Sequence, residues 1–130
     1  MINKCTFCSL YETSECNCLG GYNIKNIQNP PIMVVSDYVR QRYTHGYFTG
    51  AVTRDMDYVL KSTKIKPEDV FFTGLVRCAP PVKNKQQRNP SKEEVEKCSV
   101  YLEEEIYKVK PKVIIACGVI AFEYFFPSLS

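Results

Sequence analysis

The chain has 130 residues and a formal net charge of +3, and 45% of its residues are hydrophobic and 24% charged. This length and composition predict one globular domain, and exclude two independent domains, a disordered tail and a fibrous repeat. No apolar run approaches the roughly 20 residues that span a membrane, and Cys5 comes before an apolar signal region can form, so we expect a cytoplasmic protein without membrane contact.

Residues 1–30 carry no sustained apolar period of either 2 or 3.6. They contain the pair Cys5-x-x-Cys8, two further cysteines, a Gly-Gly step and an Asn-Pro step. Glycine and proline steps of this kind are typical of loops. We therefore expect a loop-rich N-terminal segment that is held in place by a cofactor rather than by a core.

The middle of the chain predicts a strand, a helix and a second strand. Residues 32–35 form a short apolar run between a Pro-Pro step and a polar pair, which favours a strand buried on both faces. Residues 50–62 have apolar side chains at helical spacing, with acidic residues early and Lys61 late. Pro67 ends this connection, and residues 70–76 read as the second strand.

A long loop interrupted by proline is expected next, and then a helix, a strand and a short helix. Ser91 and Glu94 form the capping box of a helix that Pro111 stops, with an apolar stripe along one side. Residues 113–117 predict the third strand, Gly118 a turn, and residues 119–126 a helix closed by Pro127. Alternating strands and helices predict a parallel sheet with right-handed crossovers. The expected fold class is a three-layer α/β/α domain with a short sheet of about three strands.

Seven cysteines are unusual for such a domain. A disulfide framework does not suit a reducing compartment, and an odd number cannot pair completely. Cys5 and Cys8 supply two thiolates from one turn, Cys78 follows the second strand, and Cys98 lies on the capped helix. Four thiolates suit either zinc or an iron-sulfur cluster. For Cys98 the alternative is a small buried hydrophobe of the core.

Several blocks of the sequence, taken together and in order, resemble the iron-sulfur (family 4 type) uracil-DNA glycosylases. This resemblance covers nearly the whole chain and implies a single uracil-DNA glycosylase-like domain over residues 1–130, with a cluster-binding segment at 1–30 and an α/β core at 31–130. It also implies a 4Fe-4S cluster on Cys5, Cys8, Cys78 and Cys98, with zinc in the same positions as the runner-up. The blocks are Cys5-x-x-Cys8, residues 76–81, the helix from Pro90 to Ile106, and residues 111–118.

The same resemblance implies that the base-binding pocket is degenerate. The family has Gly-Glu-Ala-Pro-Gly after the first strand, and the corresponding residues 36–40 leave only Asp37 to polarise a water. Phe48 matches the aromatic residue that stacks on a flipped base, with a core position as its alternative. The family's Asn that reads the uracil edge is Gly74 here, which has no side-chain donor or acceptor. The family's catalytic His-Pro-Ser motif has no counterpart before Ser130.

Two segments without acidic residues predict contact with nucleic acid. Residues 38–54 and 71–92 contain basic side chains but no Asp or Glu, and both follow the carboxyl ends of strands, where open α/β sheets bind ligands. Such loops can bind phosphates, with aromatic rings available for stacking; ordinary solvated loops are the alternative. The candidate DNA-binding residues are Arg40, Arg42, Arg77, Lys83, Lys85 and Arg88.

The third strand is apolar throughout, and the strand that pairs with it in the family is not encoded. A bare apolar edge promotes aggregation. We therefore expect a second copy or a different protein to cover this edge, and a DNA polymerase is the candidate by analogy with viral and phage proteins. That analogy also suggests the cytoplasm of a bacterium or of a phage-infected host.

Three functional hypotheses remain open. The first is a catalytically degenerate iron-sulfur glycosylase relative that binds DNA or docks to a protein in DNA replication or repair. The second is an active DNA glycosylase that removes uracil or another damaged base, with Asp37 and Phe48 in its site and a partner chain completing it. The third is an interaction protein without DNA contact.

Overall fold

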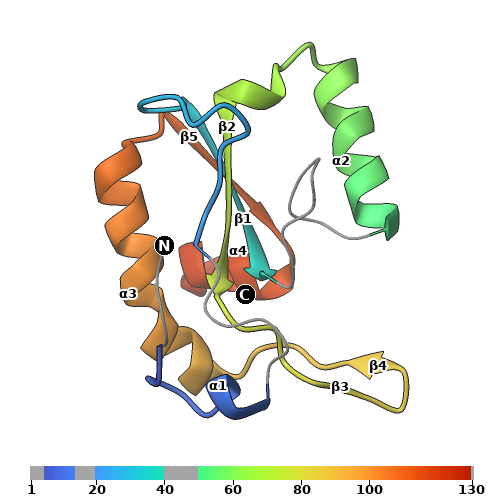
Figure 1. Ribbon diagram of the computed structural model, residues 1–130, viewed down its shortest axis with the longest axis vertical. Helices are drawn as coiled ribbons and strands as arrows, with labels where there is room; N and C mark the ends of the chain where they lie inside the picture. Colours follow the sequence, from blue (N-terminus) through green and yellow to red (C-terminus); the bar gives the residue numbers. More distant parts are fainter. Residues whose placement is uncertain (1–4, 14–19, 40–49, 130) are drawn as a thin grey trace.

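A three-stranded parallel sheet forms the centre of the computed structural model, which describes residues 5–13, 20–39 and 50–129 (Figure 1). Its strand order is β2-β1-β5, from β1 (Ile32–Tyr38), β2 (Val70–Val76) and β5 (Val113–Cys117). The helices are α1 (Leu10–Thr13), α2 (Gly50–Ser62), α3 (Lys92–Val109) and α4 (Val119–Phe125), and the 3₁₀ turns are η1 (Pro67–Asp69) and η2 (Pro127–Leu129).

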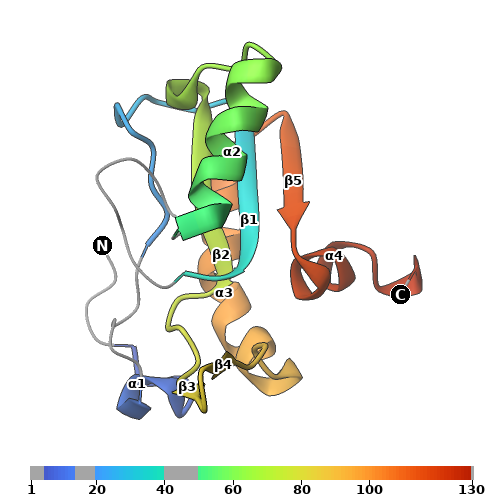
Figure 2. The same ribbon diagram turned by 90° about the vertical axis from the view of Figure 1, so that its right-hand side faces the viewer.

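The helices cover the two faces of the sheet, and the predicted three-layer α/β/α class is confirmed (Figure 2). Side chains alternate along β1, so successive residues enter different cores. Met33 packs with Leu102 of α3 and Ala121 of α4 on one face. Val34 packs with Leu60 of α2 on the other face. The continuous apolar run of β1 therefore serves two cores at once.

The predicted elements are observed with small changes at their ends. The second and third strands have the predicted bounds, but β1 continues through Tyr38, so that Asp37 lies inside the strand rather than after it. The capping box of α3 is present: the Glu94 amide donates to Ser91 Oγ at 3.2 Å, and the Ser91 amide donates to Glu94 Oε1 at 2.8 Å.

The segment after β2 differs from the predicted loop. It contains a small antiparallel hairpin, in which β3 (Val82–Lys83) pairs with β4 (Gln86–Gln87). Asn84 and Lys85 both have positive φ angles, 53° and 61°, as a two-residue type I′ turn requires. The sequence signal for this turn is weak because no glycine is present, and it was therefore missed.

The outer edge of β2 is closed by residues 20–23. Tyr22 and Phe72 exchange two backbone hydrogen bonds of 2.8 Å each. Asn23 Nδ2 donates to the carbonyl oxygens of Glu68 at 2.6 Å and Val70 at 2.9 Å. The N-terminal segment thus bonds to the backbone groups of Phe72 and to the carbonyl of Val70, which an open edge strand would leave without partners.

The outer edge of β5 is open: among the described residues, no strand pairs with it on the side away from β1. Figure 2 shows β5 and α4 projecting beyond the rest of the sheet. Large apolar side chains are exposed there, with Val113 at 53% and Val119 at 65%. We call this surface the β5–α4 face; its residues are Val113, Ile114, Ile115, Val119, Phe122 and Phe126.

No helix in the described ranges combines the length and hydropathy that crossing a membrane requires.

Candidate functional site

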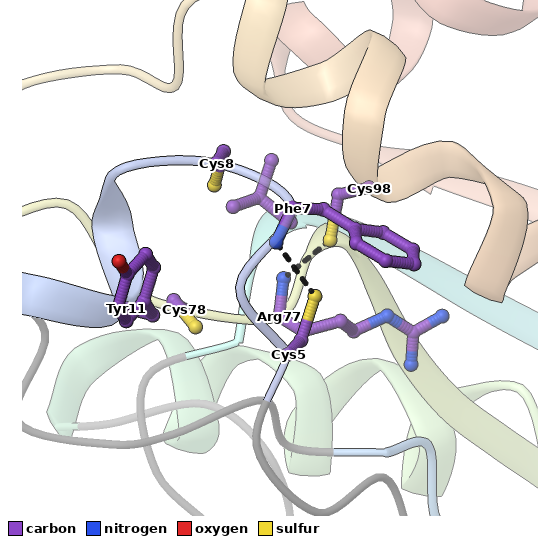
Figure 3. Close-up of a pocket in the computed structure, with 8 residues that line it drawn as sticks. Cys5, Phe7, Cys8, Tyr11, Arg77, Cys78 and Cys98 are labelled. Carbon is purple, nitrogen blue, oxygen red and sulfur yellow. Dashed lines mark hydrogen bonds between the residues drawn. The ribbon is translucent and has the colours of Figure 1, made fainter.

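The four predicted ligand cysteines line a single pocket (Figure 3). Cys5 and Cys8 come from the segment before α1, Cys78 follows β2, and Cys98 projects from the second turn of α3. Phe7, Tyr11, Val76 and Arg77 complete the lining. The four cysteines that the resemblance implies as ligands thus lie in one pocket although they are far apart in the sequence. Cys117, which has no counterpart in the resemblance, lies outside this pocket.

Backbone amides donate to two of the four sulfur atoms. The Phe7 amide lies 3.4 Å from Cys5 Sγ, and the Arg77 amide lies 3.3 Å from Cys98 Sγ. Burial raises the pKa of Cys98 to about 11, and the bond from the Arg77 amide opposes that rise. A thiol in this setting ionises when a cation binds, because the metal replaces the solvation that burial removes.

The residues present fit an iron-sulfur cluster by the chemistry of the donor set, which is four thiols without a carboxylate or imidazole among the pocket residues. Within the described residues, no three His, Cys, Asp or Glu side chains form a group that could hold one metal ion. The unpaired Arg77 Nε is also compatible with a bound group in this pocket. It is a buried donor without an acceptor among the described residues, and Arg77 lines the same pocket.

The Arg77 guanidinium is fully buried, with 0% of its side chain exposed, and pairs with Glu105 of α3. Its two terminal nitrogens donate to the two carboxylate oxygens at 2.9 and 2.5 Å. Glu105 also accepts from Thr73 Oγ1 at 2.6 Å and from the Gly21 amide at 2.7 Å. The prediction that Arg77 contacts DNA is therefore corrected, because this side chain has no surface to offer to a phosphate.

Asp37 caps helix α4. Its Oδ1 accepts from the Ala121 amide at 2.8 Å, although the position before the helix is occupied by Gly118. A side chain at Gly118 would collide with the Asp37 carboxylate. Burial raises the pKa of Asp37, while the bonds from the α4 amides oppose the rise. A helix-capping role was not predicted, since the two residues are far apart in sequence.

Gly74 lies where the backbone comes close to other atoms. A Cβ built there would be 2.7 Å from Val39 Cγ2, 3.1 Å from the Tyr38 carbonyl carbon and 3.2 Å from Ser36 Oγ. These contacts are too short for an ordinary side chain, so an Asn at this position would require the neighbouring strand end to move.

A comparison with protein families decides the assignment, since the model of the uracil DNA glycosylase superfamily matches residues 26–130. The chain belongs to this superfamily. Among characterised relatives, the type-4 uracil-DNA glycosylase of Archaeoglobus fulgidus is 35% identical over 79 residues, which are 61% of this chain and 38% of that protein. The type-4 uracil-DNA glycosylase of Thermotoga maritima is 28% identical over 126 residues, which are 95% of this chain and 62% of that protein.

The chain thus spans less than two thirds of the length of either relative. The type-4 uracil-DNA glycosylase of Pyrobaculum aerophilum matches over a similar stretch, with 39% identity over 74 residues, or 57% of this chain and 36% of that protein. The activity named for the longer relatives remains a proposal for this chain.

Of the other predicted DNA-binding residues of this uracil-DNA glycosylase-like chain, some lie in the described structure and some lie outside it. Lys83 and Lys85 are exposed on the β3–β4 hairpin. Arg88 is half exposed, and its terminal nitrogens each donate to Glu94 at 2.8 Å, which ties the hairpin to the start of α3. Arg40, Arg42 and Phe48 lie outside the described residues, so their roles stay predictions.

Proposed function

We propose that this chain is an iron-sulfur uracil-DNA glycosylase-like protein with a degenerate base pocket, acting as a DNA-binding or docking module in DNA replication or repair. The convergence of Cys5, Cys8, Cys78 and Cys98 on one pocket is the observation that carries this proposal. A cluster bound there would supply four iron-sulfur bonds that join the N-terminal segment to the end of β2 and to α3.

The cofactor is tested on the purified protein by iron and acid-labile sulfide analysis together with the visible spectrum. We expect iron, sulfide and a broad visible absorption band, whereas zinc without visible absorption would support the runner-up. Cys98→Ser should abolish the band. Cys117→Ser is the matched control, because Cys117 is a free thiol outside the pocket, and this variant should keep the band.

Two contacts support degeneracy of the pocket. Gly74 carries no side chain for a base edge, and its surroundings leave no room for one. The carboxylate of Asp37 is committed to the α4 amides, which reduces its capacity to take a proton from water. The alternative is an active glycosylase that uses this carboxylate.

A cleavage assay on uracil-containing single- and double-stranded oligonucleotides separates the two. We expect no product above background, with or without a candidate partner chain. Asp37→Asn is the informative control, because the amide oxygen can still cap α4 while the base is lost. Product that forms with the unmodified protein and disappears with Asp37→Asn would assign the active alternative.

DNA contact is proposed at the β3–β4 hairpin, because Lys83 and Lys85 are exposed there beside the half-exposed Arg88. We expect salt-dependent binding to unmodified oligonucleotides, with affinity that falls when Lys83 and Lys85 are both changed to Gln. Each lost phosphate contact lowers the slope of log affinity against log salt by about 1. Lys61 and Lys66, exposed at the far end of α2 and beyond it, give the matched double-Gln control. Equal affinity for the two double variants would overturn the hairpin as the contact, and no binding by the unmodified protein would support the interaction protein without DNA contact.

We also propose that the β5–α4 face binds a second copy of this chain. Half of the backbone groups of an edge strand point away from its neighbour and need a partner. An antiparallel pair of β5 strands would supply them by two-fold symmetry. Exposed Lys110 and Lys112 precede β5, while Asp37 and exposed Glu123 lie at its other end. Such a pair brings opposite charges together at both ends.

The oligomeric state tests this. Light scattering after size exclusion should give a dimer for the unmodified chain and a monomer for Ile115→Lys. Val100→Lys introduces the same charge at an exposed valine of α3, which is 49% exposed, and should remain dimeric. A monodisperse monomer at high concentration would overturn the proposal. Binding of that monomer to a DNA polymerase, lost in Ile115→Lys, would assign the face to a different protein.

A further inference from the structure

The Arg77 guanidinium has one donor that the protein does not use. Two of its nitrogens are bonded to Glu105, but Nε is buried and has no hydrogen-bond partner among residues 5–13, 20–39 and 50–129. Arg77 is 0% exposed, so solvent does not reach the group. A buried donor without an acceptor is unfavourable, and such groups in native proteins usually meet a ligand, an ion or an ordered water.

The pocket that Arg77 lines is rich in sulfur atoms. Arg77 lines the pocket together with the four cysteines, Phe7, Tyr11 and Val76. In Figure 3 its side chain runs past Cys5 and under the ring of Phe7. Its own backbone amide already donates to Cys98 Sγ. The main chain of Arg77 therefore contacts the cysteine pocket directly, and its side chain leaves the pocket beneath the ring of Phe7.

We propose that Arg77 Nε–H donates a hydrogen bond to a sulfur atom of the iron-sulfur cluster, and that Glu105 is the positioning residue that aims it. This inference rests on the proposed function, because it requires the cluster. Glu105 is itself fixed by Thr73 of β2 and by the amide of Gly21. The carboxylate therefore holds the guanidinium in one plane, and Nε is the nitrogen of the group that has no acceptor among the described residues.

The expected effect on the cluster comes mainly from this hydrogen bond. The charges of Arg77 and Glu105 nearly cancel at a distance, since the pair is bidentate. A donor to sulfur stabilises the more negative, reduced state of a cluster and raises its potential. Groups that support metal ligands in this way also slow the loss of the metal.

Arg77→Lys separates this role from simple structural support. The ammonium can still pair with Glu105, but it has no donor at the Nε position. We expect a folded protein by circular dichroism, a midpoint potential shifted to more negative values, and iron release to a chelator that is about 10-fold faster or more. Lys108→Arg is the matched control, because Lys108 also pairs with a glutamate of α3, Glu104, but both side chains are exposed. It should leave both quantities unchanged.

A measurement on the unmodified protein avoids any dependence on the folding of variants. With arginine labelled by ¹⁵N only in its guanidinium group, pulsed electron paramagnetic resonance of the reduced cluster should detect a ¹⁵N coupling. A loaded protein without this coupling, or an Arg77→Lys protein with unchanged potential and iron release, would overturn the inference while leaving the proposed function intact. A protein that contains zinc instead of iron would overturn both.

Discussion

The two edges of the central sheet are finished in opposite ways. The β2 edge is closed by Tyr22 and Asn23 through backbone and side-chain hydrogen bonds, and Glu105 links that segment to β2 and α3. The β5 edge has none of these, and presents exposed Val113 and Ile115 instead.

The two edges therefore differ in the kind of contact that they present. Polar bonds gather on the side that carries the cysteine pocket, where directional contacts fix ligands in place. Apolar area is left on the other side, where it can drive association. The β2 side is therefore held by internal hydrogen bonds, whereas the β5 side carries the apolar surface proposed above to bind a second copy.

The strongest way to break the closed side is to remove Glu105. Glu105→Ala leaves a buried guanidinium without its counter-charge and frees the bonds to Thr73 and Gly21. The free energy of unfolding should fall by about 3–5 kcal/mol, which chemical denaturation can measure. Glu104→Ala removes an exposed pair with Lys108 on the same helix and should change it little. Equal losses would show that the buried pair contributes no more to the free energy of unfolding than the exposed pair does.

A smaller loss is expected from Asn23, which anchors the edge segment together with the Tyr22–Phe72 bridge. Its amide group donates to two carbonyls before and in β2, and its oxygen accepts from the amides of Lys25 and Ile27. Asn23→Ala should lower the free energy of unfolding by about 2–3 kcal/mol and speed hydrogen exchange of the Tyr22 amide. Lys25→Ala breaks only an exposed ion pair and should do neither. Unchanged exchange at Tyr22 would mean that the backbone bridge needs no anchor.

On the open side, Asp37 stabilises α4 as a helix cap. Asp37→Ala removes the acceptor for the Ala121 amide and should cost about 0.5–2 kcal/mol, measured by thermal unfolding. Asp37→Asn keeps an acceptor oxygen and should cost less. If both variants lose the same stability, the negative charge rather than the hydrogen bond is what α4 requires.

Much of this contrast follows from local sequence patterns. Strands at 70–76 and 113–117 and the capping box at Ser91 are set by apolar runs, prolines and nearby polar residues, and all are confirmed. The meeting of the four cysteines was also expected, because a resemblance gave their order and the topology gave their edge.

Two of the contacts that were not predicted join residues far apart in the chain. Arg77 was expected at the surface, since an arginine in an acid-free loop usually is, but Glu105 lies 28 positions away and draws it inside. Asp37 and Ala121 are 84 positions apart. Nothing in the local pattern of either residue reveals its partner, because such pairs are selected by the fold as a whole.

The smallest effects are expected from pH, and they have opposite signs on the two sides. Arg88 holds the pKa of Glu94 below its usual value, so this carboxylate stabilises the protein above pH 4.5 and its contribution is lost as the pH falls through the lowered value. Burial raises the pKa of Asp37, so its contribution is largest below the ordinary value of 3.8 and declines as the pH rises through the raised value.

Denaturation midpoints measured from pH 7 down to pH 3 can separate these two carboxylates. Glu94→Gln should flatten the loss of stability at low pH, since the amide no longer titrates, whereas Asp37→Asn should steepen it. Glu93→Gln, at an exposed neighbour of Glu94, should leave the profile unchanged. If Glu94→Gln and Asp37→Asn moved the profile in the same direction, the two sides would not differ electrostatically as their contacts imply.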